Sequence, residues 1–154
     1  MAIRRFSHLG LCVADLERAL RFYRDGLGFR ERSSLDVAGA PAETLLALRD
    51  VKLRAVYLER DGLRLELLHF ASPGSCGGAA IRPMNQLGLT HLSFRVDDLD
   101  AALARLADLG GLALADTRVA IPAARTRAVF LTDPDGTRIE LVEAPGDPTA
   151  LPGE

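Results

Sequence analysis

The sequence predicts an α+β protein made of two tandem modules, each with the order strand, helix, strand, strand, strand (βαβββ). Three observations lead to this prediction. The stretch HLGLCVADLERALRFYRDGLG, which begins at His8, recurs with constant spacing from His91 as HLSFRVDDLDAALARLADLGG. Apolar residues alternate with polar ones in the flanking segments, as they do in strands. The closing segments RLELL (64–68) and RIELV (138–142) also match, so the halves repeat from end to end.

The elements of the first half follow from apolar spacing and turn residues. Asp15 has the residue type and the position of an N-cap, and Gly26–Gly28 are suited to end the helix that it starts. Asp61-Gly62 indicates a hairpin turn. We therefore expect strands at 3–13, 29–37, 51–59 and 63–70, a helix between Asp15 and Gly28, and a short helix at 41–50 that opens with Pro41.

The second half repeats this order after a glycine- and proline-containing segment that we interpret as a linker. We expect strands at 89–96, around 112–119, at 127–132 and at 137–143, a helix at 98–109, an irregular segment at 120–126 and a DPDG turn at 133–136. The predicted organisation is a first module at 1–70, a linker at 71–88, a second module at 89–143 and a frayed tail at 144–154.

Composition argues against several classes of partner. The 154 residues are 48% hydrophobic and 26% charged, with a net charge of −2, which is typical of a globular domain. There is no cationic run for nucleic acid or a membrane surface, no stretch of 18 apolar residues and no signal-peptide pattern. Cys12 and Cys76 lack metal-ligand spacing, so we expect free thiols in a cytoplasmic protein.

Strand periodicity places one histidine and one glutamate on the same face of each module. Side chains alternate faces along a strand, so an apolar face forms and a polar face opposes it. Leu9, Leu11, Val13, Leu65 and Leu67 form the apolar face of the first module, and Leu92, Phe94, Val96, Ile139 and Leu141 form that of the second. The opposite faces carry His8 with Glu66, and His91 with Glu140.

These four side chains are candidate metal ligands. A lone histidine or glutamate in a strand is more often structural, but four at repeat-equivalent positions on one face favour a metal site. If the two sheets curve around a shared cleft, the four converge on it. Imidazole nitrogen and carboxylate oxygen suit Zn²⁺, Ni²⁺, Co²⁺, Fe²⁺ or Mn²⁺, and such a set leaves positions open for substrate. The third histidine, His69, has the opposite parity and is interpreted as structural.

The chain resembles the vicinal oxygen chelate superfamily, which includes glyoxalase I, methylmalonyl-CoA epimerase, extradiol dioxygenases, and the fosfomycin- and bleomycin-resistance proteins. The resemblance covers residues 3–143 and rests on the stretches HLGLCVADLERALRFYRDGLGF, LTHLSFRVDDLDAAL and VFLTDPDGTRIELVE. It implies that two βαβββ modules form curved sheets around a metal cleft. It also implies that His8, Glu66, His91 and Glu140 are the metal ligands.

The pattern is most similar to glyoxalase I and methylmalonyl-CoA epimerase-like members, which use four protein ligands. This implies a metal-dependent lyase or isomerase that acts through a metal-stabilised enediolate on a small carbonyl or thioester substrate. One divalent ion is expected per site, with Ni, Zn or Co favoured and Fe or Mn as further candidates. By resemblance, Glu140 is the catalytic base and Glu66 its partner on the opposite side.

Two other functions stay open at this point: an extradiol-type dioxygenase, and a drug- or metabolite-binding resistance protein of the same fold. An anionic part of a substrate could bind to arginines that lie on the polar face or around the irregular segment, namely Arg95, Arg138, Arg118, Arg125 and Arg127. We also expect a homodimer that covers exposed sheet edges, a site formed within one chain, and lid contacts from residues 81–86.

Overall fold

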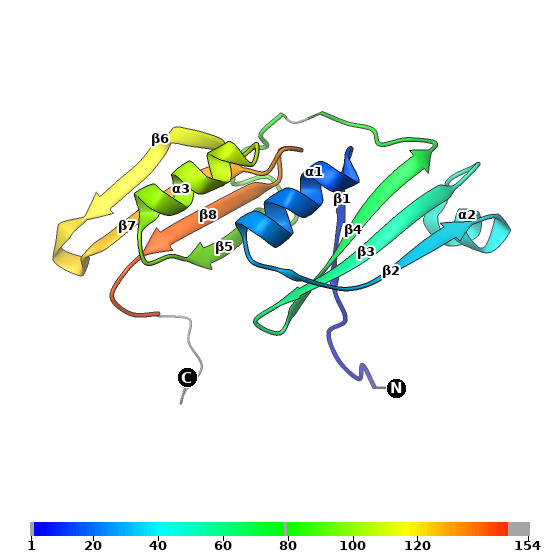
Figure 1. Cartoon of the computed structure of the whole chain (residues 1–154), viewed down its shortest axis with the longest axis horizontal. Helices are drawn as coiled ribbons and strands as arrows, with labels where there is room; N and C mark the ends of the chain where they lie inside the picture. Colours follow the sequence, from blue (N-terminus) through cyan, green and yellow to red (C-terminus); the bar gives the residue numbers. More distant parts are fainter. Residues whose placement is uncertain (1, 79, 148–154) are drawn as a thin grey trace. The chain divides into compact units, whose positions relative to one another are not determined.

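The structure is a computed structural model that describes residues 2–78 and 80–147. The chain divides into two compact units with the boundary between Gly77 and Gly78. Each unit holds one four-stranded sheet (Figure 1). The order of elements confirms the predicted pair of βαβββ modules.

The first unit contains a sheet of order β1-β4-β3-β2. The first strand runs parallel to β4, and the other neighbours are antiparallel. Its elements are β1 (Leu9–Cys12), α1 (Leu16–Leu20), the π-helical continuation η1 (Arg21–Gly26), β2 (Arg30–Ala38), α2 (Ala40–Leu46), β3 (Lys52–Arg60) and β4 (Leu63–Ser72).

The second unit repeats this topology as a sheet of order β5-β8-β7-β6, again with its first strand parallel to the closing strand. Its elements are β5 (Leu92–Arg95), α3 (Leu99–Asp108), β6 (Leu112–Ile121), the 3-10 turn η2 (Pro122–Ala124), β7 (Thr126–Thr132) and β8 (Arg138–Glu143). The repeat seen in the sequence is therefore a repeat of strand order and of strand direction.

Helices α1 and α3 begin at or within one residue of their predicted starts. The Asp15 carboxylate accepts a hydrogen bond from the Arg18 backbone N–H at 2.9 Å. The Asp98 carboxylate accepts from the N–H groups of Asp100 and Ala101, both at 3.0 Å. Each aspartate thus satisfies orphan N–H donors of the first helical turn.

Several predicted boundaries are wrong at their ends. The strand predicted at 3–13 is limited to Leu9–Cys12, because only these residues pair with β4, through its Leu65–Leu68 stretch. The strand predicted at 89–96 is likewise limited to the residues that pair with β8. The helix predicted at 41–50 ends at Leu46, because Ala47 adopts a left-handed conformation with φ of 52°.

The connecting segments also differ in detail from the prediction. The predicted linker 71–88 loses its first two residues to β4, and its other described residues lie outside helices and strands. Strand β6 extends into the segment expected to be irregular, and η2 follows it. In the predicted tail, residues 144–147 form no helix or strand, and 148–154 lie outside the described residues.

Each sheet buries one face beneath its helix. Leu65 and Leu67 on β4, and Ile139 and Leu141 on β8, are all fully buried. Helix α1 contacts β4, and α3 contacts β8. The face that carries the neighbouring polar positions is therefore directed away from the helix, as alternation requires. We call it the polar face of each module. Among the described residues, no helix is long and apolar enough to cross a membrane.

Candidate metal centre

The polar face of the first module brings His8 and Glu66 together. Strand β1 pairs in parallel with β4 so that Gly10 lies opposite Glu66. His8 stands two residues before Gly10 and therefore has the same parity. The Nε2 atom of His8 lies 3.1 Å from Oε2 of Glu66. These are two of the four predicted ligands.

The polar face of the second module brings the other two predicted ligands together in the same way. Ser93 on β5 lies opposite Glu140 on β8, and His91 stands two residues before Ser93. The Nε2 atom of His91 lies 3.5 Å from Oε2 of Glu140. Each module thus presents one imidazole and one carboxylate with the same atoms facing each other.

The residue before each histidine fixes its ring. Nδ1 of His8 lies 3.0 Å from the Ser7 hydroxyl, and Nδ1 of His91 lies 2.9 Å from the Thr90 hydroxyl. When Nδ1–H donates to the hydroxyl oxygen, Nε2 carries the lone pair that faces the glutamate. Such a partner on the second nitrogen orients an imidazole that serves as a ligand.

An aromatic ring packs edge-on against each histidine. Tyr57 on β3 lies 5.4 Å from the His8 ring centre at 78°, and Phe130 on β7 lies 5.3 Å from that of His91 at 81°. Both aromatics lie opposite the glutamate of their own module in the strand register. The imidazole in each module is therefore held on two sides, by a hydroxyl and by a ring.

Each carboxylate also accepts a hydrogen bond from a hydroxyl, but the donor differs between the modules. In the first module Tyr57 donates to Glu66, and this bond raises the pKa of Tyr57 to about 12. In the second module the Ser93 hydroxyl donates to Oε2 of Glu140 at 2.7 Å. A phenol with a raised pKa keeps its proton at neutral pH and remains a donor.

The spacing of each pair fits two neighbouring ligands of one divalent ion. A ligand nitrogen and a ligand oxygen lie about 2.1 Å from the ion, and so about 3.0–3.4 Å from each other at ordinary coordination angles. The separation of 3.1 Å in the first module lies within this range, and that of 3.5 Å in the second lies just above it. Within the part of the chain that the structure describes, no group of three or more candidate ligands occurs. Each module therefore supplies half of the predicted ligand set.

The remaining candidate residues have other surroundings. Nδ1 of His69 lies 3.5 Å from the carbonyl oxygen of Val13, the residue that follows β1, which agrees with its interpretation as structural. Among the described residues, neither Cys12 nor Cys76 forms a disulfide, and both are exposed.

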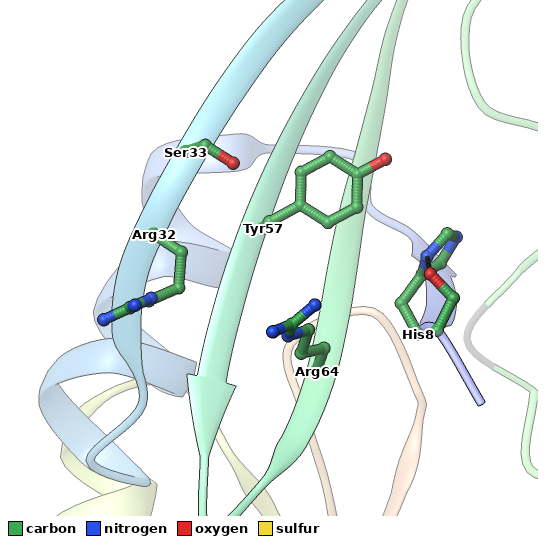
Figure 2. A pocket seen from close by; sticks show the side chains of 6 residues that line it. His8, Arg32, Ser33, Tyr57 and Arg64 are labelled. Atoms are coloured by element: carbon green, nitrogen blue, oxygen red, sulfur yellow. Dashed lines mark hydrogen bonds between the residues drawn. The ribbon is translucent and has the colours of Figure 1, made fainter. Parts of the chain in front are cut away.

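An open pocket of about 440 Å³ adjoins the His8–Glu66 pair on the polar face of the first module (Figure 2). Strand β2 contributes Arg32 and Ser33, β3 contributes Tyr57 and β4 contributes Arg64, while Ser7 and His8 complete the lining. The pocket thus extends across the sheet from the candidate ligand His8 to the edge strand β2.

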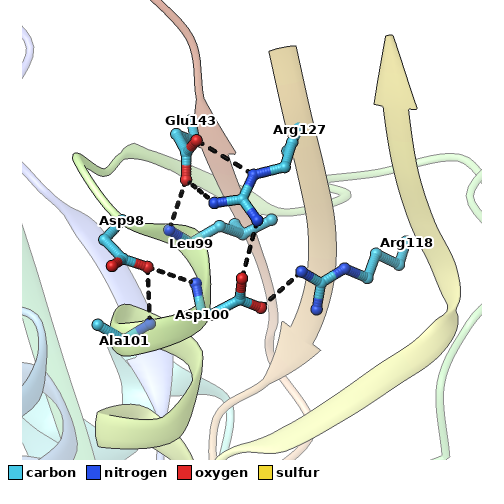
Figure 3. A network of polar contacts seen from close by, with 7 residues as sticks. All are labelled: Asp98, Leu99, Asp100, Ala101, Arg118, Arg127 and Glu143. Atoms are coloured by element: carbon cyan, nitrogen blue, oxygen red, sulfur yellow. Dashed lines mark hydrogen bonds and ion pairs between the residues drawn. The ribbon is translucent and has the colours of Figure 1, made fainter. Parts of the chain in front are cut away.

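Most of the arginines singled out in the sequence are engaged elsewhere. Arg127 bonds to Glu143 and to Asp100, and Arg118 bonds to Asp100 at 2.5 Å (Figure 3). Glu143 also accepts from the backbone N–H of Leu99, the first residue of α3, at 2.8 Å. This network ties the start of α3 to β7 and β8, so it holds the helix rather than a ligand.

The two arginines on the polar face of the second module contact backbone oxygens. Arg95 donates to the carbonyls of Ala144 and Gly146. Arg138 donates to the Arg82 carbonyl at 2.5 Å, contacts Sδ of Met84 at 2.7 Å, and lies 5.8 Å above the Phe130 ring. The segment 82–84 therefore lies on the polar face, within the range expected to supply lid contacts.

Sequence reasoning did not identify the residues that support the ligands. Ser7 and Thr90 precede the two histidines directly, so the repeat itself contained this signal. Tyr57 and Phe130 could have been found only from the strand register, because the hairpin turns between each aromatic residue and its glutamate differ in length by one residue. Arg32 carried no signal, since its side chain is placed by an irregularity of β2 between Glu31 and Ser33.

Comparison with known proteins gives a consistent family. The family model described as Glyoxalase/Bleomycin resistance protein/Dioxygenase superfamily matches residues 5–141. The chain is 30% identical over 143 residues to the uncharacterized protein YaeR of Escherichia coli, which covers 93% of this chain and 98% of that protein. It is 28% identical to an ethylmalonyl-CoA/methylmalonyl-CoA epimerase of Cereibacter sphaeroides, over 90% of this chain and 97% of the epimerase.

Solved structures share the fold. A glyoxalase family protein of Bacillus cereus superimposes with a TM-score of 0.79 at 22% identity, covering 95% of this chain and 97% of that one. A fosfomycin resistance protein of Listeria monocytogenes, in complex with Mn(II) and sulfate, superimposes with a TM-score of 0.56 at 16% identity, over 93% of this chain and 94% of that one.

Proposed function

We propose, from the premise that this chain belongs to the Glyoxalase/Bleomycin resistance protein/Dioxygenase superfamily, that it is a divalent-metal-dependent lyase or isomerase. Its substrate would be a small carbonyl or thioester compound. The observation that carries the proposal is the matched pair of His–Glu contacts, one on the polar face of each module, at 3.1 and 3.5 Å.

The proposed ligands are His8, Glu66, His91 and Glu140, which together would hold one ion. Two imidazoles and two carboxylates suit Ni²⁺, Zn²⁺ or Co²⁺, and also Fe²⁺ or Mn²⁺. The Mn(II) in the Listeria protein supports a divalent ion in this fold. When bound, the ion would polarise a substrate carbonyl and make the adjacent C–H more acidic.

Glu140 is the proposed base that removes and returns this proton. Its side chain is 27% exposed, whereas that of Glu66 is 14% exposed, so Glu140 is the more accessible carboxylate. The Ser93 hydroxyl holds Oε2 of Glu140 at 2.7 Å and orients the group. Glu66 is the proposed partner on the opposite side, and Tyr57 holds its carboxylate.

The epimerase of Cereibacter sphaeroides supports this reaction class, because the likeness extends over 97% of its length. At 28% identity the substrate does not transfer with the fold, so methylmalonyl-CoA is used below as a first probe rather than as the proposed substrate.

We also propose a homodimer with each site formed by the two pairs of one chain. Strands β2 and β6 are edge strands of their sheets. Leu35 on β2 and Val119 and Ile121 on β6 are exposed apolar residues along these edges. A second copy that covered such edges would remove unpaired strand surface. Light scattering coupled to size exclusion measures this mass directly.

The function is tested by exchange of the α-proton with solvent. The protein is loaded with Ni²⁺, Co²⁺ or Zn²⁺ and incubated in D₂O with methylmalonyl-CoA and with a panel of small 2-hydroxycarbonyl compounds. We expect metal-dependent deuterium uptake with at least one probe. In Glu140→Gln we expect this rate to fall by a factor of about 10²–10⁴, since a positioned base contributes about that much.

The matched control is Glu143→Gln, which changes a glutamate of the same strand that contacts the helix side of the module. Exchange should continue in this control. Exchange at the wild-type rate in Glu140→Gln would place the base elsewhere. Oxygen consumption with a catechol, in place of proton exchange, would favour the dioxygenase alternative.

A further inference from the structure

The polar face of the first module carries two guanidinium groups that the described structure leaves without a partner. These are Arg32 and Arg64, which line the pocket beside His8 (Figure 2). Both residues are exposed. No hydrogen bond or ion pair is found for either of them among the described residues, although other arginines of the module, such as Arg54 and Arg60, are bonded.

The two arginines reach the pocket for different structural reasons. Arg64 has the parity of Glu66 on β4, and two residues along a strand separate these positions by about 7 Å. Arg32 is the extra residue of an irregularity in β2, between Glu31 and Ser33. A bulge of this kind re-aims a side chain, and bulges are common beside functional sites.

The rest of the lining is suited to anionic oxygen atoms. Ser33 and Ser7 bring hydroxyl groups to the pocket, and the Ser7 hydroxyl lies beside His8. The Tyr57 ring stands between Ser33 and His8 (Figure 2). Guanidinium groups bind carboxylate and phosphoryl oxygens through paired N–H donors, and hydroxyls add single bonds. The pocket has no acidic side chain in its lining.

The order of residues along β4 indicates how a bound ligand would be oriented. On the polar face, Arg64 is followed by Glu66 and then by Leu68 and Phe70, which pack against the apolar cluster beneath α2. The proposed ligand carboxylate thus lies between a cationic pocket and an apolar patch. A ligand aligned with this strand would place its charged end at Arg64.

The second module offers no equivalent pocket. Its counterpart of Arg64 is Arg138, which already contacts the Arg82 carbonyl and Met84. Arg95, on the same face, contacts two backbone carbonyls. Of the polar-face arginines described, those available to a ligand therefore lie in the first module.

We propose that Arg32 and Arg64 bind a terminal anionic oxygen group of the substrate, a carboxylate or a phosphoryl group, and so select the substrate class. This inference rests on the proposed function, because the bound anion is part of a substrate only if the His–Glu pairs form the reaction site. It narrows the substrate to a carbonyl or thioester compound with an anionic end close to its reacting carbon.

The test measures anion binding by the metal-free protein, so that it does not depend on metal chemistry. Chelator-treated protein at constant ionic strength is titrated with inorganic phosphate and, separately, with malonate. Binding is followed by amide NMR shifts and by calorimetry. We expect saturable shifts at Ser33 and Tyr57 with at least one anion, and the stronger of the two identifies the phosphoryl or the carboxylate class.

Substitution then assigns the binding to the two side chains. In Arg64→Gln and Arg32→Gln we expect affinity to fall about tenfold or more, as for loss of a charge-assisted hydrogen bond. The control Arg21→Gln removes the same charge from the helical side of the same module, where Arg21 is exposed, and should change affinity less than about twofold. Chemical shifts of the core report that each variant is folded.

Two results would overturn the proposal. One is the absence of saturable binding of both anions by the wild-type protein. The other is an equal loss of affinity in Arg21→Gln and in the two pocket variants, which would indicate general electrostatic attraction. Anion binding that persists in a protein without proton-exchange activity would leave the pocket assigned and overturn only the proposed reaction.

Discussion

The polar faces of the two modules share the same arrangement of a histidine and a glutamate, but they differ in the residue that donates a hydrogen bond to the glutamate. In both, a histidine stands before the first strand, a glutamate lies on the closing strand, a hydroxyl holds Nδ1 and an aromatic ring packs edge-on. The hydroxyl that bonds the glutamate comes from Tyr57 on β3 in the first module. In the second it comes from Ser93 on β5.

This difference separates the features that the two polar faces share from those that vary. In the first module the aromatic residue, Tyr57, has a hydroxyl, and Gly10 stands opposite the glutamate on the first strand. In the second module the aromatic residue, Phe130, has none, and Ser93 stands opposite the glutamate instead. The hydrogen bond to the carboxylate is kept while its donor moves from one neighbouring strand to the other. The bond, rather than the residue that makes it, is therefore the common element of the two His–Glu pairs, which are the half-sites of the proposed metal centre.

The helix sides of the two modules differ as well. Arg54 and Arg127 occupy matched positions, opposite His69 and Glu143 respectively in the strand register. Arg127 joins Glu143 and Asp100 into a network that holds the start of α3, whereas Arg54 pairs with Asp36 on the edge strand. In the second module these ion pairs connect the sheet to its helix, whereas the Arg54–Asp36 pair joins two strands of the first sheet.

The largest effect is expected when one half-site is removed from each of two chains. Chains carrying His8→Ala and chains carrying His91→Ala are mixed, unfolded and refolded together, and their metal content and proton exchange are measured. If both half-sites of one chain form one site, every mixed dimer has two broken sites, so neither property returns. Recovery of one intact site per mixed dimer would show that the half-sites come from different chains.

An intermediate effect is expected when the hydroxyl donor is removed. Tyr57→Phe leaves the Glu66 carboxylate without its phenol, and we expect metal affinity to fall about tenfold, as for loss of a bond that orients a ligand. Ser93→Ala should do the same through Glu140. Competition with a chelator of known affinity measures both.

A serine at Gly10, the position equivalent to Ser93, would give the first module the hydroxyl donor of the second and tests the same prediction by rescue. A Cβ at Gly10 would lie 3.3 Å from Cδ1 of Leu68, the end of a flexible side chain, and 3.9 Å from Oε2 of Glu66. The double variant Gly10→Ser/Tyr57→Phe should therefore recover most of the affinity that Tyr57→Phe loses. If Tyr57→Phe keeps full affinity, the hydroxyl has no role in orienting the ligand.

The smallest effect concerns acid sensitivity. Hydrogen bonds from Arg127 lower the pKa of Glu143, and those from Arg118 and Arg127 lower the pKa of Asp100. A lowered pKa in the folded state gives stability that is present above the ordinary pKa and is lost as pH falls through the folded value. Urea midpoints should thus decline between about pH 5 and pH 3.

The matched pair Arg127→Gln and Arg54→Gln tests whether this decline belongs to the second module. Arg127→Gln should reduce the loss of stability with acid, because the carboxylates then titrate closer to their ordinary range. Arg54→Gln should leave the decline as it is in the wild-type protein. Equal acid profiles in the two variants would contradict a specific role of the network.

The sequence predicted the two modules, the N-cap Asp15 and the place of one histidine and one glutamate on the same face of each module, because these depend on local pattern and on strand parity. It did not predict Tyr57 or Ser93 as donors, since their roles depend on which strands are neighbours. It also offered five arginines as candidates for anion binding, and the structure engages four of them in other contacts, namely Arg95, Arg118, Arg127 and Arg138. Arg32 was missed because it lies at an irregularity of β2, where the strand register shifts between Glu31 and Ser33.

The count of bound metal ions tests most directly whether the two half-sites serve one ion. Native mass spectrometry and elemental analysis of the Ni²⁺- or Zn²⁺-loaded protein give ions per chain for the wild type, His8→Ala and His91→Ala. We predict one ion per chain in the wild type and close to none in either variant, with the fold intact by circular dichroism. Two ions per chain in the wild type, with one retained in each variant, would show that the His–Glu pairs bind independently and would contradict the account.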